Sequence, residues 1–224
     1  MLLSVIIPNY NEEKTIEIII NKVIQQKKNI NLEIIVVDDF SSDKSKEILK
    51  KLKLSEKIDH LIFHEKNYGK GFAIQSALVK CSGEIIIIQD ADLEYDPNDY
   101  EYMLSTMKQK RLKCIYGSRV LGKNRYNLNN FTSLFRIFAN HILTILTNLI
   151  YRQRLTDAHT CYKMIRARIF KKLNLREKGF AFCPEVTTKL SKMNCKIYEV
   201  SISYNGRTYN DGKKITSIDG LIAL

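Results

Sequence analysis

A chain of 224 residues is long enough for one large domain or two small ones, and 45% hydrophobic with 27% charged residues is typical of an ordinary globular protein. Only 3 prolines and 9 glycines exclude a collagenous or mainly disordered chain. The net charge of +12 is uneven, because residues 1–110 carry 15 basic and 18 acidic side chains whereas residues 111–224 carry 21 and 6. The basic second half favours an anionic partner, a class that includes nucleic acid, anionic lipid and phosphorylated small molecules.

The start of the chain and its cysteines indicate a cytoplasmic protein. The first ten residues have no basic start and only a short apolar run, so they do not predict a secretory signal. The 5 cysteines are odd in number and widely spaced, which predicts neither a disulfide framework nor a zinc site. His60 and His64 have no third ligand nearby, and we interpret them as an ordinary surface pair.

In the first half, short apolar runs alternate with segments of helical pattern. The runs are rich in Ile and Val and too short for core helices, so they predict buried strands at 4–8, 33–39, 60–64 and 84–92. The intervening segments predict helices at 11–27, 43–52 and 71–80, which begin with Asn11, with Asp43 and with a glycine turn. This alternation predicts an α/β fold with a doubly wound, mostly parallel sheet that binds ligands at the carboxyl ends of its strands.

The second half is less regular. Residues 114–119 predict a strand and a turn, and residues 131–151 predict a helix with an apolar stripe. Polar residues interrupt that stripe, which excludes a membrane span of ~20 predominantly apolar residues. A core helix is one interpretation; a helix lying in a membrane interface is the other, because Arg125, Arg152 and Arg154 flank it. The absence of a repeat or linker predicts a single domain.

Three carboxylates follow the fourth apolar run. If the chain stays extended, alternate side chains face the same way, so Asp90, Asp92 and Glu94 could meet at one point. Mg²⁺ typically takes one or two carboxylates and completes its shell with phosphate and water. A turn that merely caps the next helix explains Asp96, but two like charges directly after a buried strand repel each other unless a cation separates them.

Two further segments point to the same rim. The doublet Asp38 and Asp39 ends the second strand, near where a base or ribose would lie in a doubly wound sheet. Residues 67–73, NYGKGFA, do not match the phosphate loop GxxxxGK[ST]. Their glycines suit a tight turn into a helix, and we expect Lys70 to point at this rim.

Eight segments in order resemble the signature of family 2 glycosyltransferases with the GT-A fold, in the dolichyl-phosphate or polyprenyl-phosphate mannosyltransferase branch. They are SVIIPNYNEE, EIIVVDDFSSD, NYGKGFAIQSAL, IIIIQDADLEYDP, YGSRVLG, LTDAHTCYKMIR, FAFCPEVTTKL and SYNGRTYNDGKKI. The resemblance covers essentially the whole chain. It implies one glycosyltransferase domain, 1–224, with a nucleotide-sugar and metal half at 1–110 and an acceptor half at 111–224 that contains the amphipathic helix 131–151.

The resemblance also implies roles for individual residues. The residues around the nucleotide base and ribose would be Pro8, Tyr10, Glu12, Val37 and Asp39. The donor site would further include Lys70 and Ala91, and Mg²⁺ or Mn²⁺ would bind Asp90, Asp92 and Glu94. The donor or acceptor phosphates would contact Arg119, Arg207 and Lys213. The residues implied for catalysis are Asp90, Asp92, Arg119 and Asp157. Some relatives carry an amide where this chain has Glu94.

The implied reaction is attack by a lipid phosphate oxygen on the anomeric carbon of a nucleotide sugar, with inversion. The donor would be of the GDP-mannose or UDP-glucose type, with mannose favoured, and the acceptor a polyprenyl or dolichyl phosphate. A phosphate monoester is largely ionised at neutral pH, so no strong general base is required. The enzyme would work in the cytoplasm, with peripheral contact at the anionic cytoplasmic face of the membrane. Such proteins often extend further at the C-terminus, so the ending GLIAL fits either a soluble form or a piece of a longer chain.

Three alternatives remain open. A related transferase could use a saccharide hydroxyl in cell-surface polysaccharide synthesis, with Asp157 as base; otherwise Asp157 would contact sugar hydroxyls. A phosphatase with a DxD motif is disfavoured, because its motif normally follows the first strand, with Thr or Val at the position of Glu94. A nucleic-acid-binding module lacks any reading motif and leaves the carboxylates unexplained, so we expect no nucleic-acid partner.

Overall fold

The computed structural model describes residues 1–121 and 131–207, with residues 131–139 described by their backbone alone. Seven strands form one sheet in the order β3-β2-β1-β4-β6-β5-β7. Their bounds are β1 Leu3–Asn9, β2 Leu32–Asp38, β3 His60–Phe63, β4 Ile85–Ile88, β5 Cys114–Ser118, β6 Lys163–Arg166 and β7 Tyr198–Ser201. β6 runs antiparallel to β4 and β5, while the other pairs are parallel, so the predicted mostly parallel α/β sheet is confirmed.

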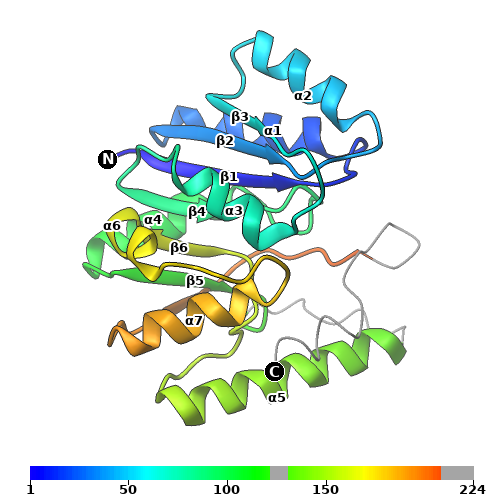
Figure 1. Ribbon diagram of the computed structural model, residues 1–224. Coiled ribbons are helices and arrows are strands. Elements are labelled where there is room, and N and C mark those ends of the chain that lie inside the picture. Colours follow the sequence, from blue (N-terminus) through cyan, green and yellow to red (C-terminus); the bar gives the residue numbers. More distant parts are fainter. Residues whose placement is uncertain (122–130, 208–224) are drawn as a thin grey trace.

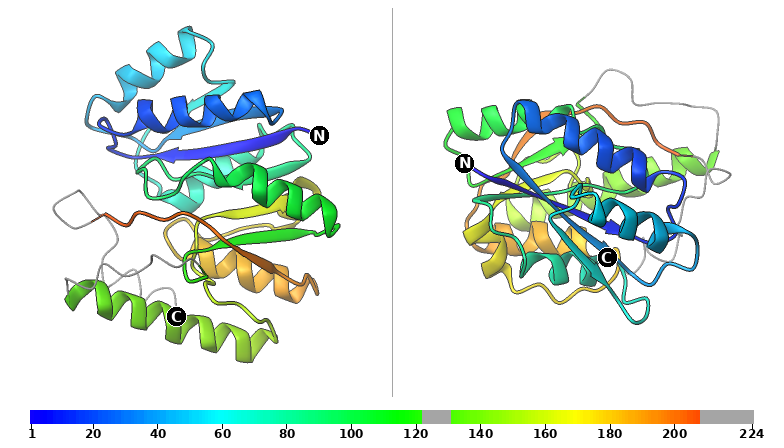
Figure 2. Two further views of the ribbon diagram at one scale, coloured as in Figure 1. Left: turned by 180° about the vertical axis from the view of Figure 1, so that it is seen from behind. Right: turned by 90° about the horizontal axis from the view of Figure 1, so that it is seen from above.

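Helices cover both faces of this sheet (Figures 1 and 2). Their bounds are α1 Ile16–Gln25, α2 Ser45–Leu54, α3 Lys70–Leu78, α4 Asp99–Gln109, α5 Phe131–Tyr151, α6 Ala167–Phe170 and α7 Phe182–Lys192, with short 3-10 turns at Gln26–Lys28 and Lys171–Leu173. In Figure 1, α3, α6 and α7 lie in front of the sheet, and α1 and α4 lie behind it. α1 buries one apolar stripe against the sheet, formed by Ile16, Ile19, Ile20 and Val23.

The core consists of the Ile and Val runs that predicted the strands. All residues of β2 and β4 are buried, as expected for strands covered on both faces. β3 is an edge strand and only half-buried, so the prediction of a buried strand at 60–64 was wrong in that respect. The fourth strand ends at Ile88 rather than at Asp92.

Two of the three helix starts predicted in the first half were too early, whereas α3 begins at Lys70, one residue before its predicted start. α1 begins at Ile16, because Asn11 adopts a left-handed backbone conformation with φ of 50°. α2 begins at Ser45, whose backbone N–H donates to Asp43 Oδ1 at 2.9 Å. Asp43 therefore caps the helix from two residues further upstream.

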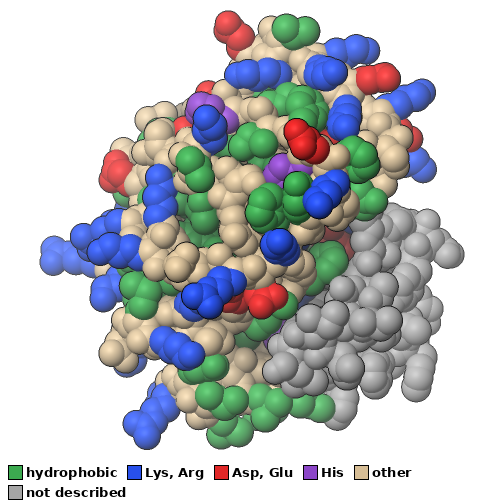
Figure 3. Space-filling model, viewed as in Figure 1, with side chains coloured by type: hydrophobic (Ala, Val, Ile, Leu, Met, Phe, Trp, Pro, Cys, Tyr) green, Lys and Arg blue, Asp and Glu red, His purple; other side chains and the backbone are tan. Residues whose placement is uncertain are grey.

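α5 lies apart from the sheet and packs against α7, at the bottom of Figure 1. Its described outer residues form an exposed apolar stripe: Ile142, Ile145, Leu146, Leu149 and Ile150. Hydrophobic side chains gather along this lower edge of the molecule (Figure 3). Among the described residues, no helix is long and apolar enough to cross a bilayer.

Gly69 lies directly before the first residue of α3, and we expect Gly69→Ala to destabilise the protein. Its φ is +98°, and an added Cβ would lie 2.6 Å from the carbonyl oxygen of Lys178. Backbone strain of this kind costs about 1–3 kcal/mol, and the contact adds to it. Urea unfolding should show a loss of about 2 kcal/mol or more. Gly179→Ala is the control, because a Cβ there meets nothing within 4 Å; equal losses for both variants would contradict the expectation.

Candidate active site

The carboxyl ends of β1, β2 and β4 meet at one rim of the sheet. From β1 the chain adds β2 and β3 on one side of the sheet, and β4 then lies on the other side of β1. The strand order therefore reverses between β1 and β4. Ligands of doubly wound sheets bind at such a switch point. The right-hand ends of these strands in Figure 1 mark the place.

The Asp38–Asp39 doublet lies at this rim, but the two carboxylates are engaged within the protein. Asp38 is fully buried and accepts hydrogen bonds from Asn9 Nδ2 at 2.7 Å and from Ser41 Oγ at 2.5 Å. Asp39 accepts from the backbone N–H groups of Tyr68 at 2.9 Å and Gly69 at 2.7 Å. Asp38 therefore stabilises the turn after β2, and Asp39 binds the backbone of the loop before α3.

His64 completes this arrangement, and its interpretation as a surface residue was wrong. The side chain is 7% exposed, and Nδ1 lies 2.7 Å from Asp39 Oδ1. Nε2 lies 3.0 Å from Ser76 Oγ on α3. No sequence pattern indicates this role, because the contacts join the end of β3 to the end of β2 and to a helix that follows.

Asp90 forms an ion pair with Lys70, which points at the rim as expected. Lys70 Nζ lies 2.5 Å from Asp90 Oδ1, and Cys161 Sγ donates to the same oxygen at 3.0 Å. Burial is the largest single effect and acts to lower the pKa of Lys70, but the charge and hydrogen bond of Asp90 together with Cys161 and Cys183 outweigh it, so the pKa is raised well above its ordinary value. Lys70 therefore stays charged at the rim.

Asp92 and Glu94 lie in a tight turn, so the prediction that Asp90, Asp92 and Glu94 alternate along an extended strand was wrong. Leu93 has φ of 64°, and Asp92 Oδ1 accepts a hydrogen bond from the backbone N–H of Glu94 at 3.1 Å. Burial, followed by the charges of Asp90 and Glu94, raises the pKa of Asp92 to about 7. The ionised form of Asp92 is therefore disfavoured at this position, first by burial and then by the neighbouring carboxylates.

Arg207, the last described residue, contacts an acidic group formed by Glu12, Asp92 and Glu94. Its guanidinium donates to both Glu12 oxygens at 3.0 and 3.1 Å and to Asp92 Oδ2 at 3.0 Å. Its backbone N–H donates to Glu94 Oε1 at 2.8 Å, and Tyr204 OH donates to Glu94 Oε2 at 2.8 Å. Glu94 thus binds the segment that carries Arg207.

A divalent cation fits the donor chemistry of this rim only in company with other ligands. Within residues 1–121 and 131–207, no three His, Cys, Asp or Glu side chains are grouped closely enough to hold a metal ion. Asp90 and Asp92 nevertheless offer hard oxygen ligands in an environment of excess negative charge, and Mg²⁺ commonly needs only one or two carboxylates when phosphate supplies the rest. Asp90 and Asp92 are therefore the residues that would hold the cation.

Arg119 and Asp157 form a buried ion pair on the second half of the sheet. Arg119 Nε donates to Asp157 Oδ2 at 2.7 Å and Nη2 donates to Oδ1 at 2.8 Å. Their side chains are 13% and 1% exposed. Glu199 supports the loop by accepting from the backbone N–H of Asp157 at 2.9 Å. The Arg119 guanidinium also lies 5.3 Å from the Tyr204 ring centroid, next to the segment that carries Arg207.

The other residues implied by resemblance are spread around the rim. Tyr10 is 38% exposed just after β1, whereas Val37 is fully buried within β2, between β1 and β3. Pro8 is half-buried in β1, and Ala91 is buried between the two aspartates. Lys213 and Arg125 lie outside the described residues.

Lys163 and Cys161 also contribute to this region, although neither was predicted from the sequence. Lys163 is fully buried, donates to the carbonyl oxygen of Ala158 at 2.9 Å and lies 3.8 Å from the Tyr116 ring centroid. Burial lowers its pKa from the ordinary value. The only available signal was the isolated lysine in an otherwise apolar run, CYKMI, whose last three residues lie in β6.

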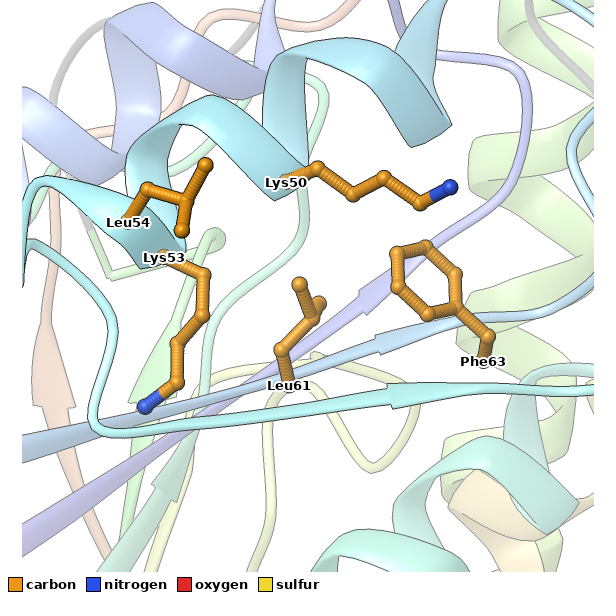
Figure 4. A pocket seen from close by; sticks show the side chains of 5 residues that line it. All are labelled: Lys50, Lys53, Leu54, Leu61 and Phe63. Atoms are coloured by element: carbon orange, nitrogen blue, oxygen red, sulfur yellow. The ribbon is translucent and has the colours of Figure 1, made fainter.

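A surface pocket of about 400 Å³ lies between α2 and β3 (Figure 4). Its lining is Lys50, Lys53, Leu54, Leu61 and Phe63. None of the residues predicted for the site lines it, although its residue Phe63 pairs with Asp38 in the ladder between β2 and β3.

Residues 4–174 match the family model for glycosyl transferase family 2. The chain belongs to this family. The glycosyltransferase is 28% identical over 215 residues to an undecaprenyl-phosphate 4-deoxy-4-formamido-L-arabinose transferase from Photorhabdus laumondii, a match that covers 94% of this chain and 62% of the relative. It is 26% identical over 237 residues to a dolichyl-phosphate beta-glucosyltransferase from Trichomonas vaginalis, covering 99% of this chain and 70% of that protein.

The glycosyltransferase is also 30% identical over 225 residues to an uncharacterised protein from Methanocaldococcus jannaschii, with 95% of this chain and 94% of that protein covered. Among solved structures, it resembles glucosyl-3-phosphoglycerate synthase from Mycobacterium tuberculosis in complex with Mn²⁺, uridine diphosphate and phosphoglyceric acid. The TM-score is 0.68 at 16% identity, covering 94% of this chain and 72% of that chain. The predicted GT-A fold and family are thus confirmed.

Proposed function

We propose that this glycosyltransferase moves a hexose from a nucleotide diphosphate sugar to a polyprenyl phosphate, with inversion at the anomeric carbon. The observation that carries the proposal is the charge arrangement at the switch point. The carboxylates Asp90 and Asp92 lie at the end of β4, and the cations Lys70 and Arg207 contact them. The names of two relatives, an undecaprenyl-phosphate and a dolichyl-phosphate sugar transferase, support a lipid phosphate as acceptor.

The reaction brings anions together, and the side chains of the rim reduce that repulsion. At an effective dielectric of 20, two unit charges 4 Å apart interact by about 4 kcal/mol. When bound to Asp90 and Asp92, Mg²⁺ or Mn²⁺ would supply charge stabilisation for the leaving diphosphate. Arg119, Arg207 and Lys213 would face the donor or acceptor phosphates, and Lys70 would stay charged beside Asp90.

The acceptor side requires little base catalysis under this proposal. A lipid phosphate is largely ionised at neutral pH and can attack directly. Asp157 would then position Arg119 and the sugar hydroxyls. Its two carboxylate oxygens already accept hydrogen bonds from Arg119, which disfavours the alternative in which Asp157 deprotonates a saccharide hydroxyl.

The base and sugar are proposed by class. A donor of the GDP-mannose or UDP-glucose type would place its base and ribose near Pro8, Tyr10, Glu12, Val37 and Asp39. We favour mannose as the transferred sugar because of the family branch that the sequence resembles. Glucose is the alternative, because one relative is named as a glucosyltransferase.

A thermal-shift screen tests the proposal. UDP and GDP, each with and without Mg²⁺ or Mn²⁺, should raise the melting temperature only when nucleotide and cation are combined. A ligand at a hundred times its Kd stabilises by about 2.7 kcal/mol. Transfer from the matching sugar nucleotide to a short-chain polyprenyl phosphate should follow. If neither nucleotide stabilises the protein with either cation, the donor assignment is wrong.

We also propose that α5 meets the surface of the membrane that holds the lipid acceptor. Its outer face exposes Ile145, Leu149 and Ile150, and exposed Arg152 and Arg154 follow its C-terminal end. An apolar stripe beside basic residues suits a helix that lies in an anionic interface, where each arginine contributes roughly 1 kcal/mol.

We expect Leu149→Glu to abolish binding to vesicles that contain anionic lipid, because Leu149, at 73%, is the most exposed residue of the stripe. Co-sedimentation should show wild-type binding that weakens with salt, since the Debye length falls from ~10 Å at 0.1 M to ~3 Å at 1 M. Val79→Glu is the matched control, because Val79 is 81% exposed but lies after α3. Wild-type binding that ignores both salt and lipid charge would contradict the proposal.

A further inference from the structure

The segment 203–207 packs against the loop that follows β4 and against the start of α4. It follows β7 and is drawn in orange across the sheet in Figure 2, left. The backbone N–H of Ser203 donates to Asp99 Oδ2 at 2.8 Å, and that of Asn205 donates to the carbonyl oxygen of Glu94 at 2.8 Å. Tyr204 packs edge-on against Tyr95, with ring centroids 5.2 Å apart. These contacts hold the backbone of Arg207 next to the acidic group.

Two sets of contacts at Arg207 differ in what they hold. Glu94 binds the backbone N–H of Arg207 and the hydroxyl of Tyr204, so it retains the segment itself. Glu12 and Asp92 bind the guanidinium. The guanidinium can therefore leave Asp92 while Glu94 keeps the segment in place.

One donor of the Arg207 guanidinium also lacks a hydrogen-bond partner. Its side chain is 16% exposed, and its Nε has no hydrogen-bond partner although it is buried; the nearest Glu94 oxygen is 4.0 Å away. A buried donor without a partner is costly, which is unfavourable for a permanent structural ion pair. The position is better suited to a charge that also has a second partner.

We infer that Arg207 is an exchangeable counter-ion of the donor site. In the ligand-free chain it neutralises Asp92, and it leaves Asp92 when a divalent cation binds there with the donor diphosphate. The displaced guanidinium then pairs with the diphosphate, while Glu94 acts as a positioning residue that retains the segment. This inference rests on the proposed function and adds a competition between Arg207 and the metal ion.

Titration calorimetry with Mn²⁺ alone tests the competition. Arg207→Gln should bind Mn²⁺ roughly tenfold more tightly than the wild type, because a competing cation is removed from Asp92. In the presence of a saturating amount of whichever of UDP or GDP binds the wild type, the order should reverse, since the variant lacks the guanidinium that pairs with the diphosphate. Arg207→Lys keeps the charge and should remain close to the wild type.

Arg166→Gln is the matched control, because Arg166 lies on β6 and its Nε donates to the carbonyl oxygen of Leu112. It should leave both affinities unchanged. If Arg207→Gln binds Mn²⁺ no more tightly than the wild type, the exchange is wrong. If the wild type binds Mn²⁺ with a nucleotide in that case, the proposed function stands without it; if the wild type binds neither cation nor nucleotide, both fail.

A measurement on the wild type covers the possibility that the variant misfolds. In protein labelled with ¹⁵N-arginine, the Nε–H signal of Arg207 can be assigned by its absence from Arg207→Lys. Adding Mg²⁺ with UDP or GDP should move this signal, because the guanidinium changes partners. A signal that stays in place while the nucleotide binds would overturn the inference.

Discussion

Replacing Asp92 by Asn is expected to reduce sugar transfer by on the order of a hundredfold or more, which corresponds to about 3 kcal/mol of transition-state stabilisation. Asp92 lies at the switch point and is proposed to hold the cation that offsets the leaving diphosphate. The fold should survive, because burial and the neighbouring charges of Asp90 and Glu94 already disfavour the ionised form of Asp92 and raise its pKa to about 7. Initial rates with a sugar nucleotide and a polyprenyl phosphate, together with the melting temperature, check both parts.

Asp96→Asn is the matched control for this prediction. Asp96 lies four residues further along and accepts a hydrogen bond from the backbone N–H of Asn98 at 3.0 Å, at the entrance of α4. Its replacement should leave the rate within a few-fold of the wild type. Near-normal turnover of Asp92→Asn in chelator-treated buffer would rule out the metal assignment, and a phosphorylated Asp90 found by intact-mass measurement would favour the phosphatase alternative.

Breaking the Arg119–Asp157 pair should have the largest effect on stability. Asp157→Asn leaves a buried guanidinium without its charged partner, and losses of this kind amount to about 3–5 kcal/mol. The side chains are 13% and 1% exposed, so water screens the pair poorly. Urea unfolding should show the loss, and adding Arg119→Gln to Asp157→Asn should restore part of it, because the two residues are directly coupled.

The exposed pair of Lys27 and Asp59 supplies the comparison. Its atoms are 3.8 Å apart and its side chains are 39% and 40% exposed, so Lys27→Gln should cost less than about 1 kcal/mol. A loss for Asp157→Asn as small as that of Lys27→Gln would show that the buried pair does not stabilise the second half of the chain. Transfer rates of Asp157→Asn should be compared at a temperature where the variant is folded, with phosphate and hydroxyl acceptors assayed separately.

The sequence by itself determined the layered α/β architecture and the location of the candidate site. Runs such as Ile34–Val37 and Ile85–Ile88 cannot be exposed to water without a large cost, so they had to become buried strands. Polar residues directly after such runs had to lie at the carboxyl ends of the strands. This local argument was sufficient to place Asp38, Asp39, Asp90 and Asp92 at one rim.

The same local argument failed where the backbone left the strand. β4 ends at Ile88, and the left-handed conformation of Leu93 turns the chain, so side-chain alternation no longer predicts where Asp92 and Glu94 point. β6 and β7 were also missed, because their sequences KMIR and YEVS mix charged with apolar residues and their burial depends on neighbours from distant parts of the chain.

Only the tertiary structure decided which charges meet at the rim. Asp92 pairs with Arg207, 115 positions away, and Glu12 pairs with the same arginine across 195 positions. His64, read from the sequence as a surface residue, is held between Asp39 and Ser76. Ion pairs of this kind depend on how crossover connections and a strand added at the far edge bring separate segments together, and residue spacing along the chain carries no information about that distance. The sequence therefore placed the carboxylates, and the fold selected their partners.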